Sequence, residues 1–215
     1  MFTKAASALS LKVRALEDAW FDLSRRVDTS GDPMVRPAKD TIGPASDGYA
    51  YLPARARNVR KLLRSLPLGD VRQYTFIDMG SGKGRSLFIA AELAFRAVVG
   101  VEHSAALHHV AEANLRKLRA SAGVRSRVQL VYGDAGVYEF PAGNVVLFLF
   151  NPFGPEVMGR VLSNLQLAIR NEKRHAIVTL LWPELSQMVA DLPEMKCVHQ
   201  SRRFDIFQAG TAGAV

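Results

Sequence analysis

Residues 76–85 read Phe76-Ile77-Asp78-Met79-Gly80-Ser81-Gly82-Lys83-Gly84-Arg85. An apolar run that ends in an acid and opens into alternating glycines predicts a buried strand, a tight turn and the start of a helix. Glycine permits the turn and lets the backbone approach a ligand closely, and the first turn of the next helix presents free N–H groups. The segment therefore indicates a strand-loop-helix unit that binds a nucleotide-type cofactor.

The spacing of the glycines disfavours two phosphate-binding motifs. The dinucleotide fingerprint G-x-G-x-x-G, counted from Gly80, needs a glycine where this chain has Arg85. A P-loop follows its Gly-Lys pair with Ser or Thr, whereas Gly82-Lys83 is followed by Gly84. A nicotinamide-dependent oxidoreductase and a P-loop NTPase are therefore both disfavoured.

Two more acids follow apolar segments further along the chain. Glu102 ends the segment 97–102, and Asp134 follows the segment 128–132. Because the carboxyl ends of parallel strands meet at one edge of a sheet, we expect Asp78, Glu102 and Asp134 to lie at the same edge. A carboxylate in the position of Glu102 can accept hydrogen bonds from both hydroxyls of a ribose.

The pattern D-x-G-x-G-x-G resembles that of the class I (seven-strand) S-adenosylmethionine-dependent methyltransferases, and the resemblance extends from about residue 50 to about residue 209. It implies S-adenosyl-L-methionine as the cofactor, with the glycine loop against the methionine part, Asp78 near the amino group and Asp134 at the adenine. The cofactor-binding residues that it implies are Asp78, Gly80, Ser81, Gly82, Gly84, Glu102, His103, Asp134, Asn151 and Tyr51.

Apolar segments and helical patterns alternate along the chain, which is typical of an α/β fold with a parallel sheet. We expect strands at 74–78, 97–102, 128–132, 145–150 and 176–181, and a C-terminal hairpin from 195–199 and 204–208. Helices are expected at 54–66, 84–95, 104–120 and 155–169. With the resemblance, this predicts a Rossmann-like seven-strand methyltransferase sheet with helices on both faces and an antiparallel C-terminal strand.

The N-terminal part has a different pattern. Residues 9–26 place Leu16, Trp20 and Leu23 near helical spacing, which predicts an amphipathic helix. Residues 27–51 are rich in Asp, Thr, Ser, Gly and Pro and predict a long loop, expected to cover the cofactor. We therefore divide the chain into residues 1–50, a helix and covering loop, and residues 51–215, the S-adenosylmethionine-binding domain.

The segment 145–150 runs into Asn151-Pro152-Phe153-Gly154-Pro155-Glu156. This resembles the [D/N/S]-P-P-[F/Y/W] motif of amino-methyltransferases, with one proline instead of two. The resemblance implies that Asn151, Pro152 and Phe153 are catalytic, because in that motif the Asn oxygen and a backbone carbonyl hold the hydrogens of the acceptor nitrogen. An Asn-Pro turn that ends a strand explains the same residues without a catalytic role.

Two narrower resemblances concern the methyl acceptor. The loop G-S-G-K-G-R and the motif Asn-Pro-Phe are most similar to those of small uncharacterised bacterial class I methyltransferases. Residues 151–157 have a distant similarity to the non-SET histone lysine methyltransferases. The first gives no acceptor, and the second favours an amine nitrogen, of a protein lysine or a small molecule. The alternatives are a nucleic-acid N-methyltransferase and a non-catalytic S-adenosylmethionine-binding module.

Composition limits the partners. The net charge of +8 and the basic clusters at 55–64 and 116–127 allow a nucleic-acid partner, but no aromatic residues interleave with them, so it is not favoured. Cys197 is the single cysteine, which excludes a disulfide framework and predicts a small buried strand residue. The scattered histidines predict no metal site, and no apolar run approaches the ~20 residues of a membrane span, so a cytoplasmic protein is expected. Neither the acceptor nor the oligomeric state follows from the sequence.

Overall fold

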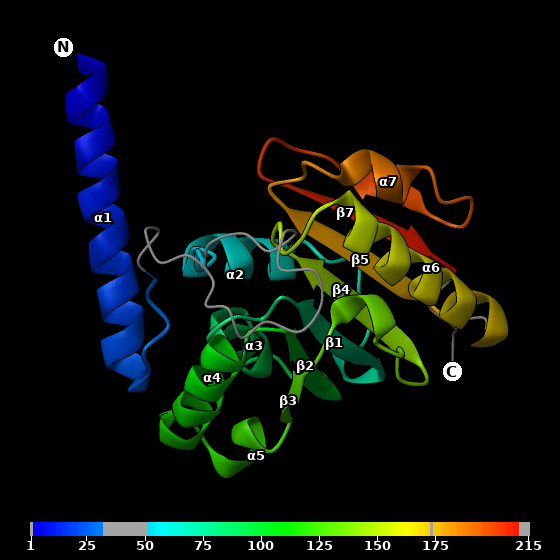
Figure 1. The fold of residues 1–215 in the computed structure, drawn as a ribbon, viewed down its shortest axis with the longest axis horizontal. Helices are drawn as coiled ribbons and strands as arrows, with labels where there is room; N and C mark the ends of the chain where they lie inside the picture. Colours follow the sequence, from blue (N-terminus) through cyan, green and yellow to red (C-terminus); the bar gives the residue numbers. More distant parts are fainter. Residues whose placement is uncertain (1, 32–50, 173, 211–215) are drawn as a thin grey trace.

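The computed structural model describes residues 2–31, 51–172 and 174–210 (Figure 1). Among these residues, seven strands form one sheet in the order β3-β2-β1-β4-β5-β7-β6. β1 to β5 run parallel, and β7 runs antiparallel to both of its neighbours. The strands are β1 (Tyr74–Met79), β2 (Ala97–Glu102), β3 (Val128–Tyr132), β4 (Asn144–Leu149), β5 (Ala176–Leu181), β6 (Lys196–His199) and β7 (Phe204–Ala209). The predicted seven-strand fold with antiparallel C-terminal strands is confirmed.

Helices cover both faces of the sheet, as predicted (Figure 1). They are α1 (Phe2–Arg25), α2 (Ala56–Arg64), α3 (Arg85–Ala91), α4 (Ala105–Lys117), α5 (Ala122–Arg125), α6 (Pro155–Glu172) and α7 (Ser186–Ala190), with 3₁₀ turns η1 (Val71–Gln73) and η2 (Ala135–Val137). The helix predicted over 84–95 ends at Ala91, and the one predicted over 104–120 ends at Lys117. Helical periodicity does not indicate α5 and α7, because each is too short to show a repeat.

The core has two halves, one on each face of the sheet. Phe76 of β1 and Phe148 of β4 lie in the cluster that includes the buried side chains of α2 and α3. Ile77 and Leu147, one position along each strand, lie in the cluster that includes those of α6. Each such buried side chain contributes roughly 1.5–3 kcal/mol. Strands buried on both faces appear in the sequence as continuous apolar runs, so their positions could be predicted from it.

The orientation of α1 differs from the one that its apolar spacing predicts. Leu16, Trp20 and Leu23 are 71%, 65% and 80% exposed, whereas the helix packs inward through Phe21 and through polar residues such as Asp18. The reason is the buried guanidinium of Arg85 on α3, which needs carboxylate partners, and α1 supplies them. The polar face of α1 is therefore its packing face in the described residues.

Two further expectations concern Cys197 and the loop over residues 27–51. Cys197 is exposed rather than buried, because β6 lies at the edge of the sheet and all its residues are exposed. Most of the loop predicted over 27–51 lies outside the described residues, so its covering role stays a prediction. None of the helices in the described residues has the length and apolarity that a membrane crossing requires.

Candidate functional site

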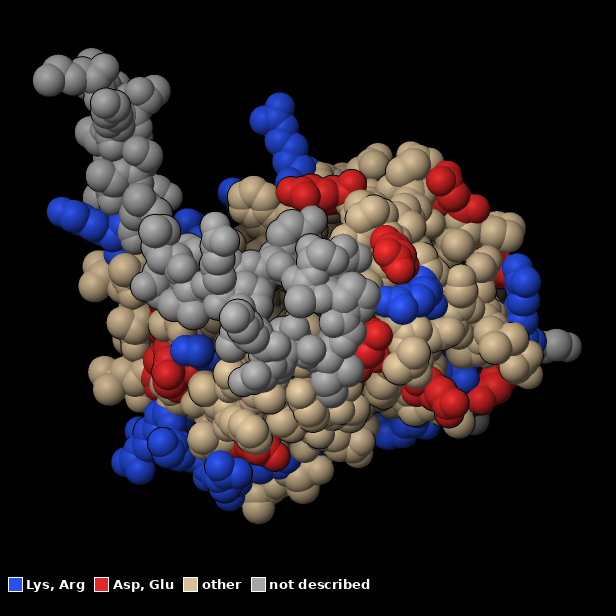
Figure 2. All heavy atoms as spheres, viewed as in Figure 1, with Lys and Arg blue, Asp and Glu red and all other residues tan. Residues whose placement is uncertain are grey.

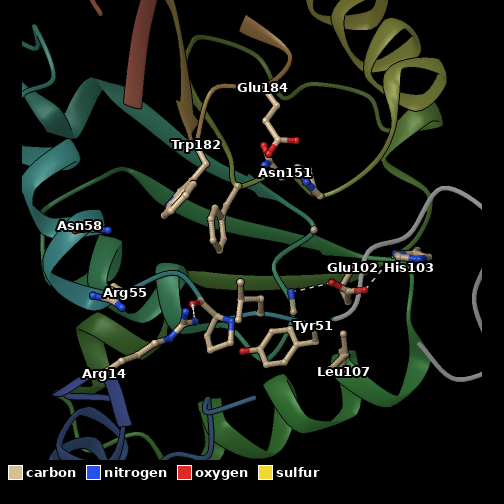
Figure 3. A pocket seen from close by; sticks show the side chains of 16 residues that line it. Arg14, Tyr51, Arg55, Asn58, Glu102, His103, Leu107, Asn151, Trp182 and Glu184 are labelled. Atoms are coloured by element: carbon tan, nitrogen blue, oxygen red, sulfur yellow. Dashed lines mark hydrogen bonds and ion pairs between the residues drawn. The ribbon is translucent and has the colours of Figure 1, made fainter. Parts of the chain in front are cut away.

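A cavity of about 390 Å³ opens where β1, β2, β4 and β5 end (Figure 3). Ligand pockets of this size are typical of small-molecule and cofactor sites. We describe its lining in three groups, the first of which joins the glycine loop and β2 to Tyr51, whose ring packs on that loop. The first is Gly80, Gly82, Glu102, His103, Leu107 and Tyr51; the second is Phe150, Asn151, Pro152, Trp182 and Glu184; the third is Arg14, Leu52, Pro53, Arg55 and Asn58.

The glycine loop after β1 needs its glycines for two physical reasons. Gly80, Gly82 and Gly84 have φ of +80°, +54° and +92°, in the left-handed region that side chains disfavour. A Cβ on Gly80 would lie 2.4 Å from the Pro152 side chain, and a Cβ on Gly82 would lie 2.3 Å from the Tyr51 ring. The loop therefore runs between Pro152 on one side and Tyr51 on the other. The glycine loop and the Asn151-Pro152-Phe153 motif, far apart in the chain, are in contact here through Gly80 and Pro152.

Glu102 is the best-positioned acid of the cavity. Its side chain is 4% exposed, and it accepts hydrogen bonds from the backbone N–H of Gly82 (2.7 Å) and of Ser104 (2.8 Å). His103 Nδ1 lies 3.2 Å from the same carboxylate, and this hydrogen bond raises the pKa of His103. The end of β2 and the glycine loop are thus tied together at the carboxylate.

The other two predicted acids do not line the cavity. Asp78 is buried within β1, where burial and the nearby charge of Glu102 raise its pKa to about 8, and a hydrogen bond from Ser86 opposes the rise. Asp134 accepts a hydrogen bond from the N–H of Gly136 (2.7 Å), which starts η2. The structure therefore brings Asp78 close to Glu102 and leaves Asp134 at a turn beside the cavity, and their cofactor roles stay predictions.

Ser81 and Gly84 shape the loop without lining the cavity. Ser81 packs under the loop, since a Cβ on Gly100 would lie 2.7 Å from its Oγ. Gly84 is the N-cap of α3, and its N–H donates to the Ser81 carbonyl (2.9 Å). Both residues set the backbone path that Gly80 and Gly82 present.

The segment after β4 is only partly as expected. Asn151 and Pro152 line the cavity, and Asn151 has a left-handed φ of +41°. Phe153, predicted to be catalytic, is 7% exposed and packs in the core with α6, so its side chain supports the segment from behind. The aromatic ring that the cavity receives from this segment is that of Phe150.

Tyr51 packs against the glycine loop and lines the cavity, and its predicted contact with the cofactor stays a prediction. Its hydroxyl donates to the Thr29 carbonyl (2.8 Å), and burial raises the pKa of Tyr51. Lys83 Nζ donates to the Ser30 carbonyl (2.7 Å) and lies 5.7 Å from the centre of the Tyr51 ring. Residues 29–30 are therefore held against the loop from both sides.

Arg85, which replaces a glycine of the dinucleotide fingerprint, has a structural role. It pairs with Asp18 and Asp22 of α1 (3.8 Å to Asp22), and its Nε donates to Thr29 Oγ1 (2.7 Å). Asp22 in turn accepts hydrogen bonds from the N–H groups of Thr29 (3.0 Å) and Ser30 (2.9 Å). This network fixes the N-terminal helix to the start of α3.

Sequence patterns did not identify the residues from α1, α2 and the end of β5. Trp182 and Glu184 come from the turn that follows β5, and Arg14, Arg55 and Asn58 come from the N-terminal side of the domain. The sequence Trp182-Pro183-Glu184 directly after a predicted strand was the one available signal. No cluster of three potential metal ligands occurs in the part of the chain that the structure describes.

Comparison with known proteins supports the fold. No protein-family model and no curated protein sequence matches the chain. The glycopeptide N-methyltransferase MtfA, solved with (S)-adenosyl-L-methionine, is similar in structure, with a TM-score of 0.52, 14% identity, and coverage of 74% of this chain and 87% of that one. A predicted N6-adenine-specific DNA methylase from Listeria monocytogenes str. 4b F2365 has a TM-score of 0.55 at 14% identity, over 74% of this chain and 52% of its own. The chain thus has the fold of these methyltransferases and spans about half the length of the second.

Proposed function

We propose that the protein is an S-adenosylmethionine-dependent methyltransferase that transfers a methyl group to an amine nitrogen. The observation that carries this proposal is that one cavity is lined by Gly80, Gly82 and Glu102 and also by Asn151, with Glu102 and Asn151 on different sides of it (Figure 3). The Glu102 side has the groups that a nucleoside cofactor needs, and the Asn151 side has the side chain that can hold an acceptor. The fold shared with solved methyltransferases supports the same assignment.

The residues present fit the cofactor. The Glu102 carboxylate faces the cavity and can accept hydrogen bonds from ribose hydroxyls, beside the apolar side chain of Leu107. The cofactor also carries a carboxylate, for which the cavity offers Arg55, whereas the Arg14 guanidinium already donates to the Pro53 carbonyl (3.2 Å) and pairs with Asp18 (3.7 Å). Lys83 and Arg85, the cations of the loop itself, are engaged with residues 18–30. Asp78, buried near Glu102, does not line the cavity, so its predicted place near the amino group of the cofactor rests on the sequence resemblance.

The chemistry requires positioning more than activation. Bound S-adenosylmethionine supplies a methyl group on a sulfonium, which is a good leaving group. The task left to the protein is to aim a neutral amine at that methyl group and to exclude competing orientations. The amide oxygen of Asn151 can accept a hydrogen bond from the amine, which fixes the direction of the lone pair. Pro152, packed on Gly80, fixes Asn151 relative to the glycine loop.

The distribution of charge does not favour a nucleic-acid acceptor. Figure 2 shows Lys and Arg side chains on several separate parts of one face, including the region of α4 and α5, without one continuous basic band. In the cluster at 116–127, Arg125 donates to the carbonyls of Leu118 and Ala120, and Arg127 donates to that of Ala91. These two arginines therefore have structural partners, which leaves fewer cations for phosphate groups.

The test is turnover. Purified protein is incubated with S-adenosylmethionine and cell extract, and S-adenosylhomocysteine is quantified. We expect product from the parent and from Glu139→Gln, an exposed carboxylate away from the cavity, and much less from Glu102→Gln. Cofactor binding without turnover on any extract would instead favour a non-catalytic binding module.

A further inference from the structure

The end of the cavity beyond the glycine loop is built by two neighbouring strands. β4 and β5 pair in parallel, so their carboxyl ends open at the same place. Asn151 follows β4 and Trp182 follows β5, and both line the cavity (Figure 3). In the view of Figure 3, the side chains of Trp182, Asn151 and Glu184 lie on one side of the cavity that they line, and Glu102 lies on another. This end is free to receive a second ligand when a cofactor occupies the first.

A compact turn holds Trp182 and Glu184 in this place. The N–H of Trp182 donates to the Arg203 carbonyl in the turn between β6 and β7 (2.8 Å), and the N–H of Glu184 donates to the Trp182 carbonyl (2.9 Å). Pro183, between the two residues, has a fixed φ. The turn therefore presents an indole ring and a carboxylate to the same cavity from two positions of the chain.

The conformation of Trp182 is unfavourable for stability. Its φ is +63°, one of three left-handed values at non-glycine residues of the described chain, and Asn151 has another. The side chain is 55% exposed although indole is the largest apolar group available for a core. Strained backbone at two adjacent strand ends, with an exposed aromatic ring, is typical of a ligand site.

We infer that Trp182 and Glu184 form the acceptor subsite, and that the acceptor is an alkyl amine that arrives as an ammonium ion. The inference rests on the proposed function and names its substrate class. An ammonium group is attracted to the face of an indole ring and to a carboxylate, and Trp182 and Glu184 supply both. The exocyclic amino group of a nucleobase is neutral and gains no ion pair from Glu184, so the charged amine is favoured over a base.

The reaction then balances without a further reagent. The bound ammonium first loses one proton to water at the open mouth of the cavity, which frees the lone pair that Asn151 orients. The nitrogen forms a bond to the methyl carbon while the carbon–sulfur bond breaks, and that electron pair stays on sulfur as a thioether. The product is a methylated ammonium ion and S-adenosylhomocysteine.

The test uses the fluorescence of Trp182. The chain has two tryptophans, so Trp20→Phe leaves Trp182 as the single indole. This variant is titrated with n-pentylammonium chloride and with n-pentanol, a neutral molecule of the same length, with and without S-adenosylhomocysteine. We expect saturable quenching by pentylammonium, with an affinity about tenfold above that of pentanol. Glu184→Gln in the same background should abolish the difference, and Glu139→Gln should retain it.

Three results would overturn the subsite. The first is equal binding of pentylammonium and pentanol, and the second is a Glu184→Gln variant that retains the preference for the cation. The third is quenching of Trp182 by adenosine monophosphate at lower concentration than by pentylammonium, which would indicate a nucleobase acceptor. Binding of S-adenosylhomocysteine is measured separately by calorimetry on the same variant. If it fails to bind, the proposed function is wrong, while the titration without it still decides whether the ammonium subsite exists.

Discussion

The two ends of the cavity differ in how the chain builds them. Apart from Tyr51, the glycine-loop end comes from one continuous unit, residues 74–107, and its shape depends on backbone that only glycine can supply at Gly80 and Gly82. The end at Asn151 and Trp182 comes from side chains on separate segments, and it carries left-handed backbone without glycine. Steric limits on the backbone thus fix the glycine-loop end, and a sequence motif reveals it. The end at Asn151 and Trp182 forms only when the tertiary fold brings separate segments together.

The largest expected effect is a loss of cofactor affinity when the glycine-loop end is disrupted. Gly82→Ala places a Cβ 2.3 Å from the Tyr51 ring at φ +54°, so we expect roughly a hundredfold loss of S-adenosylhomocysteine affinity in calorimetry. Gly69→Ala is the matched control, because a Cβ there meets nothing within 4 Å. Adding Tyr51→Ala to Gly82→Ala should restore part of the affinity. Unchanged binding by Gly82→Ala would show that the loop is not at the cofactor.

The second effect concerns the carboxylate of Glu102, at the same glycine-loop end of the cavity. Glu102→Gln keeps the shape but removes the charge, and we expect about a thirtyfold weaker affinity for S-adenosylhomocysteine because charge-assisted hydrogen bonds are lost. Calorimetry measures it, with Glu139→Gln as the control for loss of one carboxylate. Equal affinities of the parent and Glu102→Gln would remove the ribose role of Glu102.

The third effect separates the two ends. Asn151→Gly removes the side chain and relieves the left-handed φ of +41°, so backbone strain is not a confounder. We expect methyl transfer on cell extract to fall about tenfold or more, while the affinity for S-adenosylhomocysteine changes little. A variant that turns over at the parental rate would show that Asn151 only ends a strand.

These effects correspond to what the sequence revealed and what it did not. The strands of the sheet and Glu102 were predictable, because buried strands read as apolar runs and strand ends meet at one edge. Phe153 packs in the core while Phe150 lines the cavity, because sequence spacing does not say which of two neighbouring aromatic rings points into the core, and a catalytic role of Phe153 stays a prediction. The packing face of α1 was misjudged because its partner, buried Arg85, is 60 or more residues away in the chain.

The fourth effect concerns Arg55 and its interaction with the cofactor carboxylate. Arg55→Met should weaken S-adenosylhomocysteine about threefold to fivefold, as expected for a partly exposed ion pair, and should leave 5′-methylthioadenosine unchanged because that ligand lacks the carboxylate. Parallel calorimetric titrations measure both. A similar loss for the two ligands would place Arg55 away from the cofactor carboxylate.

The last effect is on stability rather than on ligand affinity or turnover. The pKa of Asp78 is raised from 3.8 to about 8, so the folded chain retains a proton that the unfolded chain releases. Its contribution to the free energy of unfolding is full below pH 3.8 and is lost as the pH rises through about 8. In urea unfolding between pH 5 and pH 9, the parent should lose more stability than Asp78→Asn. The same slope in both would mean that Asp78 is ionised throughout.

The claim that one cavity holds cofactor and acceptor at opposite ends is tested most directly by a crystal structure with S-adenosylhomocysteine. The account predicts the ribose hydroxyls on the Glu102 carboxylate and the sulfur atom directed toward Asn151, with Trp182 and Glu184 still open to solvent. A ligand bound outside this cavity, or one whose sulfur points away from Asn151, would contradict it.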